Sequence, residues 1–292
     1  MKKSTNTMGA IYVTIAAVSW GIFPLFNRTL ASMGIPPITS TAIRAMIAAV
    51  IYIIWGLSKG AFKTFSFKCI PFFLFYGITA IVGTTYLYAQ AQVTLNSSSM
   101  AAVLLYTAPA FVIIFNRILY KEPVTKVKLA ALLMTFIGCF LVSGGYDISN
   151  LKINGLGLAI GLLSGLSYSM LTVIGKTAVK KYAPDLNSFM PTIMAAIVFM
   201  CMVPPWTVPV PNVSVLILYL LLSLTGTVIP YVFYTKGLST GMDGGKAILI
   251  ANTEPIVASV LGVIVFGDAI NIIQIFGIIL TLTGAAIASK DK

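Results

Sequence analysis

The most informative stretch of this chain is Leu249-Ile250-Ala251-Asn252-Thr253-Glu254-Pro255-Ile256-Val257-Ala258. It places a carboxylate and a proline inside an apolar run over residues 247–266. Burying a carboxylate in hydrocarbon costs several kcal/mol, so such groups face a polar interior and mark a pathway. Pro255 lacks an amide donor, so the carbonyl of Ala251 loses its helical partner. The stretch predicts a kinked membrane helix in which Glu254 belongs to a substrate or ion site. The alternative is a structural Glu254 paired with a neighbouring helix.

The composition indicates a membrane protein. Of 292 residues, 58% are hydrophobic and 9% are charged, whereas a soluble domain is roughly half apolar and a quarter charged. The chain has no histidine, which excludes a histidine-based metal site, catalytic dyad or proton relay. Cys69, Cys139 and Cys201 lie far apart in apolar segments and have no metal or redox spacing, so they are interpreted as core residues. No cofactor and no metal are predicted.

Ten apolar runs have the length of a membrane-spanning helix, about 20 residues each. They lie at roughly residues 8–27, 37–57, 69–90, 97–117, 125–144, 155–175, 187–206, 213–235, 246–266 and 270–288. The chain is therefore predicted to be an all-α polytopic membrane protein. Met1-Lys2-Lys3 and the run after it are interpreted as a retained first helix rather than a signal peptide, because the run is long and lacks a convincing cleavage site.

The basic residues predict the orientation. With the N-terminus inside, the cytoplasmic segments carry Lys2, Lys3, Lys59, Lys63, Lys68, Arg117, Lys121, Lys126, Lys128, Lys176, Lys180, Lys181, Lys236, Lys246, Lys290 and Lys292. The outer loops carry only Arg28 and Lys152. This bias predicts a multi-pass protein of the plasma (inner) membrane with both termini cytoplasmic. It also accounts for the net charge of +12 without a nucleic-acid partner, because the inner leaflet is anionic.

The chain repeats itself. Residues 88–143 overlay residues 234–289 at a constant offset of 146 positions, and an offset of 148 aligns the segments upstream. The first offset brings Thr107 and Pro109 onto Thr253 and Pro255. We expect two five-helix repeats, 1–150 and 151–292. Because five is odd, the second repeat crosses the membrane in the opposite sense, as is typical of secondary transporters with a site at the repeat interface.

Polar residues inside the spans are the candidates for that site. Arg44 lies about 10 Å inward from the outer end of its helix and Glu254 about 13 Å from the inner end of its own. In a hydrocarbon core about 30 Å thick these depths nearly coincide, so an Arg44–Glu254 pair is geometrically possible. The candidate substrate-binding residues are Trp20, Tyr86, Tyr88, Gln90, Tyr106, Tyr231, Tyr234, Asn252 and Glu254. Packing or interhelical hydrogen bonding remains the alternative for the aromatic and amide side chains among them.

Arg44 and Glu254 are also the candidates for a coupling or gate role. Four prolines that interrupt spans are the candidate hinges: Pro24, Pro109, Pro230 and Pro255. The first of them is expected to break the first span, together with Gly21.

The sequence resembles those of the drug/metabolite transporter superfamily, specifically its EamA-type ten-helix members. The resemblance covers nearly the whole chain and is carried by Ser19-Trp20-Gly21, Ala42-Ile43-Arg44, Tyr106-Thr107-Ala108-Pro109 with Leu119-Tyr120-Lys121-Glu122, and Glu254-Pro255-Ile256 with Val265-Phe266-Gly267-Asp268. It implies two inverted repeats, a central cavity and alternating access without ATP. Many members export amino acids or other metabolites, and some import. This chain lacks an acid in its first helix like that of the four-helix small multidrug proteins, so a proton-coupling role is carried over only to Glu254.

The leading hypothesis is a secondary carrier of a small polar metabolite, with amino-acid export as the foremost case and proton coupling left open. The main alternative is an uptake carrier for a quaternary amine or another small metabolite. A channel is disfavoured because a symmetric pore or charged ring is absent. A membrane-embedded enzyme is disfavoured because the catalytic inventory is nearly empty, so no enzymatic activity is predicted. The expected partners are the lipid bilayer, a small-molecule substrate and, in the coupled case, protons. A monomer is favoured, although the sequence leaves the oligomeric state open.

Overall fold

A computed structural model describes residues 2–147 and 154–290. Helices and short loops make up this part of the chain. The elements are α1 (Lys2–Ser32), α2 (Pro37–Lys59), η1 (Ala61–Thr64), η2 (Phe67–Cys69), α3 (Ile70–Tyr76), η3 (Gly77–Val82), α4 (Gly83–Leu95), α5 (Ser98–Leu105), α6 (Ala108–Tyr120), α7 (Lys126–Val142), α8 (Gly155–Lys181), α9 (Pro184–Met202), η4 (Pro205–Thr207), α10 (Val213–Ser223), η5 (Leu224–Val228), α11 (Ile229–Ser239), α12 (Gly244–Ala251), α13 (Glu254–Phe266) and α14 (Ile272–Lys290).

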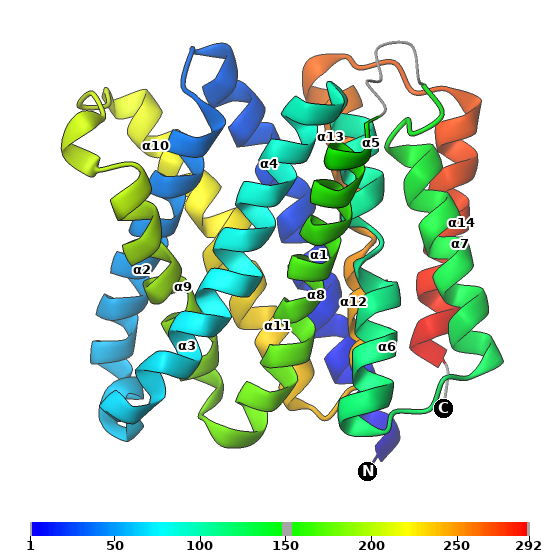
Figure 1. Ribbon diagram of the computed structural model, residues 1–292, viewed down its shortest axis with the longest axis horizontal. Helices are drawn as coiled ribbons and strands as arrows, with labels where there is room; N and C mark the ends of the chain where they lie inside the picture. The colour runs from blue at the N-terminus through cyan, green and yellow to red at the C-terminus, as the bar shows by residue number, and fades with distance from the viewer. Residues whose placement is uncertain (1, 148–153, 291–292) are drawn as a thin grey trace.

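Nine helical segments in the described part of the chain are long and apolar enough to cross a membrane. Four of them join several elements: Phe67–Leu95, Ser98–Tyr120, Val213–Ser239 and Gly244–Phe266. The tenth crossing is α7, which is only 17 residues long but lies beside α14 over a similar height (Figure 1). The predicted all-α fold of ten crossings, arranged as two repeats, is confirmed.

The described chain begins and ends at the same face of the molecule (Figure 1). We call this the terminal face and the other the opposite face. The boundary expected between residues 150 and 151, and Lys152 beside it, fall outside the residues that the structure describes.

The duplication is visible at the two broken helices. α5 and α12 begin at Ser98 and Gly244, and α6 and α13 begin at Ala108 and Glu254, each pair 146 positions apart. Both breaks occur directly before a proline in the first helical turn, where a missing amide removes one hydrogen bond from the helix. The same cause at matching positions therefore produces the same break in both repeats.

The third and eighth crossings each contain a π-helical turn, η3 and η5. Such turns displace backbone carbonyls from the regular ladder and are frequent at functional sites. Side chains of neighbouring helices donate to these carbonyls. Tyr52 of α2 donates to the carbonyl oxygen of Val228 at 3.0 Å, and Ser167 of α8 donates to that of Thr79.

The helix contacts are reciprocal between the repeats. α2 packs against α9 and α7 against α14, while α1 packs on α11 as α4 packs on α8. Small residues permit the close approach of α7 and α14, since a Cβ added at Gly284 would lie 3.0 Å from the carbonyl oxygen of Ala131.

One expectation about the fold is wrong. α1 runs from Lys2 to Ser32 with Pro24 inside it, so the first span is not interrupted there. A membrane helix tolerates an internal proline when its surroundings accommodate the freed backbone groups.

Candidate functional site

The proline break in the ninth crossing places Glu254 at the start of α13, where its side chain is half-buried. The Tyr106 hydroxyl, from the matching break between α5 and α6, interacts with the Glu254 carboxylate. Tyr88, Tyr168 and Tyr231 lie close enough for electrostatic interaction with the same carboxylate. Glu254 is thus surrounded by tyrosines that come from four other crossings.

Trp20 of α1 lies at the centre of the neighbouring aromatic rings. Its ring centroid is 5.4 Å from that of Tyr234, 5.9 Å from that of Tyr231 and 6.5 Å from that of Tyr168, all tilted or edge-on. These are favourable geometries for aromatic contacts. Trp20 and Tyr168 occupy matching positions of the two repeats, 148 positions apart, so the packing of α1 against the second repeat brings symmetry-related rings together. We define the central cluster as Trp20, Tyr88, Tyr106, Tyr168, Tyr231, Tyr234 and Glu254.

Two buried polar side chains at the cluster have no hydrogen-bond partner among the described residues. They are the hydroxyl of Tyr168 and the side-chain amide of Asn252, in which neither the oxygen nor the nitrogen is bonded. Asn252 is fully buried, and its backbone carbonyl accepts from the Cys139 thiol at 3.5 Å. An unpaired buried polar group costs about 1–3 kcal/mol. The side-chain amide of Asn116 is also unbonded, but Tyr168 and Asn252 lie at the cluster around Glu254, which suggests a ligand-binding role for these two groups.

Arg44 lies on α2, and its guanidinium is held by the π-helical turn. Its Nη1 donates to the carbonyl oxygen of Gly226 at 3.4 Å, and its Cζ lies 5.3 Å from the ring centroid of Phe23. Tyr231 interacts electrostatically with both Arg44 and Glu254. Among the described residues no ion pair joins Arg44 to Glu254, so the geometrically possible pair does not form in this conformation.

The remaining candidates lie in different surroundings. Tyr86 is 44% exposed and Gln90 is half-buried; no described interaction joins either to Glu254. The amide that interacts with the cluster is that of Gln92, beside the Tyr88 hydroxyl. The prolines at positions 109, 230 and 255 all lie in the first turns of their helices, two of them after the breaks and one after η5.

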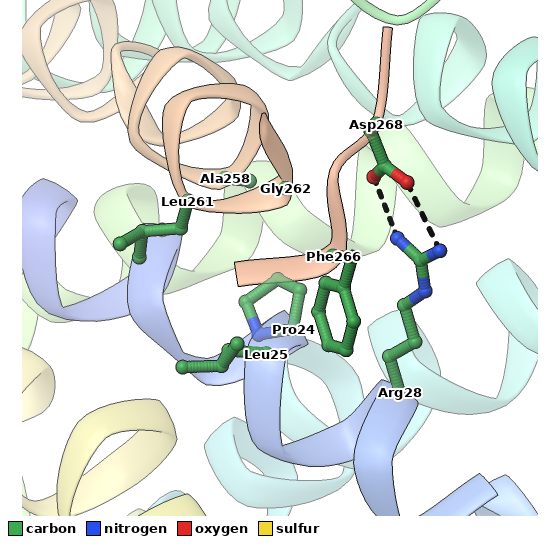
Figure 2. A pocket seen from close by; sticks show the side chains of 9 residues that line it. Pro24, Leu25, Arg28, Ala258, Leu261, Gly262, Phe266 and Asp268 are labelled. Atoms are coloured by element: carbon green, nitrogen blue, oxygen red, sulfur yellow. Dashed lines mark hydrogen bonds and ion pairs between the residues drawn. The ribbon is translucent and has the colours of Figure 1, made fainter. Parts of the chain in front are cut away.

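At the opposite face an ion pair joins α1 to the loop after α13 (Figure 2). Arg28 donates from both terminal nitrogens to the Asp268 carboxylate, at 2.6 and 3.0 Å, and its Cζ lies 4.1 Å from the Phe266 ring centroid. The hydrogen bond from Arg28 holds the pKa of Asp268 below its ordinary value. The side chains are 54% and 43% exposed, and a crevice of about 70 Å³ lies beside them.

Two buried ion pairs lie near the terminal face. Lys176 of α8 pairs with Glu122 in the loop after α6, and their side chains are 11% and 13% exposed. Lys128 of α7 pairs with Asp243 at 2.7 Å, with exposures of 3% and 15%. Sequence reasoning missed all three pairs. The repeat could have indicated two of these ion pairs, because its offsets align Arg28 with Lys176 and Asp268 with Glu122.

Comparison with known proteins identifies the protein family. The family model described as "EamA-like transporter family" matches residues 7–144 and again 155–290. The chain belongs to the EamA-like transporter family. Its family and the names of its relatives point to a membrane transporter rather than an enzyme.

The relatives of this EamA-like transporter support that class. An "Uncharacterized transporter" of Archaeoglobus fulgidus is 28% identical over 201 residues, covering 69% of this chain and 70% of the relative. The "Uncharacterized transporter YwfM" of Bacillus subtilis is 24% identical, covering 96% of this chain and 93% of the relative. A solved crystal structure superposes with a TM-score of 0.78 at 18% identity, covering 97% of this chain and 96% of its own, which supports the fold alone.

Proposed function

We propose that this EamA-like transporter is a secondary active carrier that exports a small zwitterionic metabolite, an amino acid or a related compound, by alternating access at the central cluster. One observation carries the proposal. Glu254 and Arg44 both interact electrostatically with Tyr231, and neither is paired with the other or with another charged side chain among the described residues.

Charge complementarity links this observation to the substrate class. A charge at membrane depth is costly unless it is paired. A zwitterion supplies both missing partners, because its ammonium group complements Glu254 and its carboxylate complements Arg44. The ring faces around Glu254 add favourable cation–π contact for the ammonium group. The guanidinium fork of Arg44 suits a carboxylate.

The same arrangement supports proton exchange as the driving reaction. Glu254 has no cationic side-chain partner among the described residues, so either a proton or the substrate ammonium can neutralise it. If binding of one displaces the other, the substrate leaves the cell while a proton enters. The basic residues near the terminal face support a plasma (inner) membrane location with cytoplasmic termini.

A second candidate is an uptake carrier for a quaternary amine. It is favoured by the ring contacts of Trp20 with Tyr231 and Tyr234, since aromatic cages bind such cations. Arg44 argues against it, because a cationic substrate would leave the guanidinium without an anion.

The test is transport in proteoliposomes, with substrate flux and internal pH followed for a panel of amino acids, choline and betaine. Wild type is compared with Glu254→Gln, Arg44→Gln and the exposed-loop control Lys63→Gln. We expect amino-acid flux with a pH change in wild type and in the control, and a loss of at least tenfold in both site variants. Choline flux retained in Arg44→Gln would favour the quaternary-amine carrier. Silence across the amino acids would overturn the zwitterion proposal.

A further inference from the structure

We propose that Tyr168 is a substrate-binding residue and that, with Asn252, it selects substrates whose side chain is polar and uncharged. This inference rests on the proposed function, in which Glu254 and Arg44 take the two charged ends of an amino acid. Tyr168 was not among the residues singled out in the sequence. It is 7% exposed and lies on α8 against Trp20 and near Glu254.

The unbonded hydroxyl of Tyr168 is not a general property of buried tyrosines in this protein. The Tyr76 hydroxyl donates to the carbonyl oxygen of Leu171 at 2.9 Å, that of Tyr52 donates to Val228, and that of Tyr234 is bonded to Thr172 at 2.6 Å. The Tyr168 hydroxyl has no such partner among the described residues, and Tyr168 interacts electrostatically with Glu254, Tyr231 and Tyr234. The hydroxyl groups of these other buried tyrosines are therefore hydrogen-bonded, whereas that of Tyr168, beside the candidate site, is not.

Asn252 is a second buried polar residue near Glu254 whose side chain has no hydrogen-bond partner among the described residues. It lies two residues before the carboxylate in the break, is fully buried, and has neither amide atom bonded among the described residues. The two groups together offer a hydroxyl donor and an amide that both donates and accepts. Neither carries a charge.

The substrate class follows by elimination. A charged side chain would find no further counter-ion among the residues of the central cluster. A purely aliphatic side chain would leave Tyr168 and Asn252 unpaired, and a site built to hydrogen-bond a group strongly disfavours analogues that lack it. A hydroxyl or carboxamide side chain, as in serine, threonine, asparagine and glutamine, satisfies both.

The experiment compares Tyr168→Phe with Tyr76→Phe in the full-length protein. Both variants lose only a hydroxyl, but Tyr76 uses its hydroxyl for a backbone bond on α8 outside the central cluster. Thermal stability is measured without ligand, and affinity is measured by calorimetry for serine, threonine, asparagine and glutamine against alanine and valine. Asn252→Ala is a second variant at the site.

We expect wild type to bind the polar amino acids more tightly than the aliphatic ones. Tyr168→Phe should lose about tenfold in affinity for the polar set, the loss of roughly one hydrogen bond, and keep its affinity for the aliphatic set. Its stability without ligand should be unchanged or raised, because the lost hydroxyl has no partner. Asn252→Ala should reduce the same selectivity, whereas Tyr76→Phe should lower stability and leave selectivity intact.

Three results would overturn the assignment. Equal binding of polar and aliphatic amino acids by wild type would remove the selectivity and leave the proposed function standing. Unchanged selectivity in Tyr168→Phe with lowered stability would make the hydroxyl structural. Absence of amino-acid binding in wild type would overturn both this inference and the zwitterion proposal.

Discussion

Glu122, in the loop after α6, forms a buried ion pair with Lys176 near the end of α8. The residues at the matching positions, Asp268 and Arg28, form the same pair between the repeats at the opposite face, where it is about half exposed. The terminal face has an additional pair, Lys128 with Asp243. In the matching positions the chain has Gln274 and Ser97, which carry no charge. The described conformation therefore has two buried ion pairs at the terminal face and one exposed ion pair at the opposite face.

Removing one partner of the buried pair should destabilise the protein strongly. Glu122→Gln leaves Lys176 buried without its carboxylate, so the free energy of unfolding should fall by about 3–5 kcal/mol. Thermal unfolding in detergent measures the effect. Asp268→Asn is the matched variant at the opposite face and should change stability little, because solvent screens an exposed pair. Combining Glu122→Gln with Lys176→Met should recover much of the loss. Equal effects of the two single variants would contradict the burial argument.

The carboxyl group of Asp268 should titrate at unusually low pH. Arg28 lowers its folded-state pKa by hydrogen bonding, so the associated stability is present at neutral pH and lost as pH falls through that pKa. Carbon-13 NMR of the labelled aspartate carboxyl gives the midpoint directly. Arg28→Gln should move the midpoint back toward the ordinary aspartate range near 4. The same midpoint in both proteins would show that the ion pair does not persist in solution.

The helix ends at the two broken crossings offer a matched test of backbone strain. Gly267 ends α13 at φ 70°, and at the matching position Lys121 ends α6 at φ 56°. A side chain in this left-handed region costs about 1–2 kcal/mol. Gly267→Ala should therefore lower the free energy of unfolding by about 1 kcal/mol. Lys121→Gly should change it less, because relief of strain is offset by the greater freedom of glycine in the unfolded chain. Chemical denaturation in mixed micelles compares the two.

Close packing of α1 against α13 should be necessary for transport. A Cβ added at Gly21 would lie 2.6 Å from the carbonyl oxygen of Glu254 and would also collide with the side chain of Val257. Gly21→Ala should displace α1 from the break that positions Glu254 and reduce transport at least tenfold, with a stability loss of about 1–3 kcal/mol from overpacking. Gly155→Ala is the control, since nothing lies within 4 Å of its added Cβ. Full transport by Gly21→Ala would show that α1 and α13 can move apart at this contact without loss of activity.

The sequence was sufficient for the features that arise from local chemistry. Apolar runs of membrane length predicted the ten crossings, and the matching prolines at 109 and 255 lie where both helices break. The interruption expected at Pro24 was wrong, because a proline breaks a helix only where its neighbours fail to accommodate the freed carbonyl. The π-helical turns had no local signal, since they depend on side chains of other helices that bond the displaced carbonyls.

Hydrophobicity and the missing amide of proline act over a few residues, so the crossings, the repeat and a carboxylate beside a break can be predicted from the amino-acid sequence. Which side chains meet across helices depends on how ten crossings pack, and this becomes known only from the folded structure. That packing brought Trp20 against Tyr168 and left the Tyr168 hydroxyl unpaired. It also placed the guanidinium of Arg44 within hydrogen-bonding distance of the carbonyl oxygen of Gly226 rather than beside Glu254. The physical reason is that a charge or a hydroxyl takes the partner that packing places within reach, and sequence separation sets no such distance.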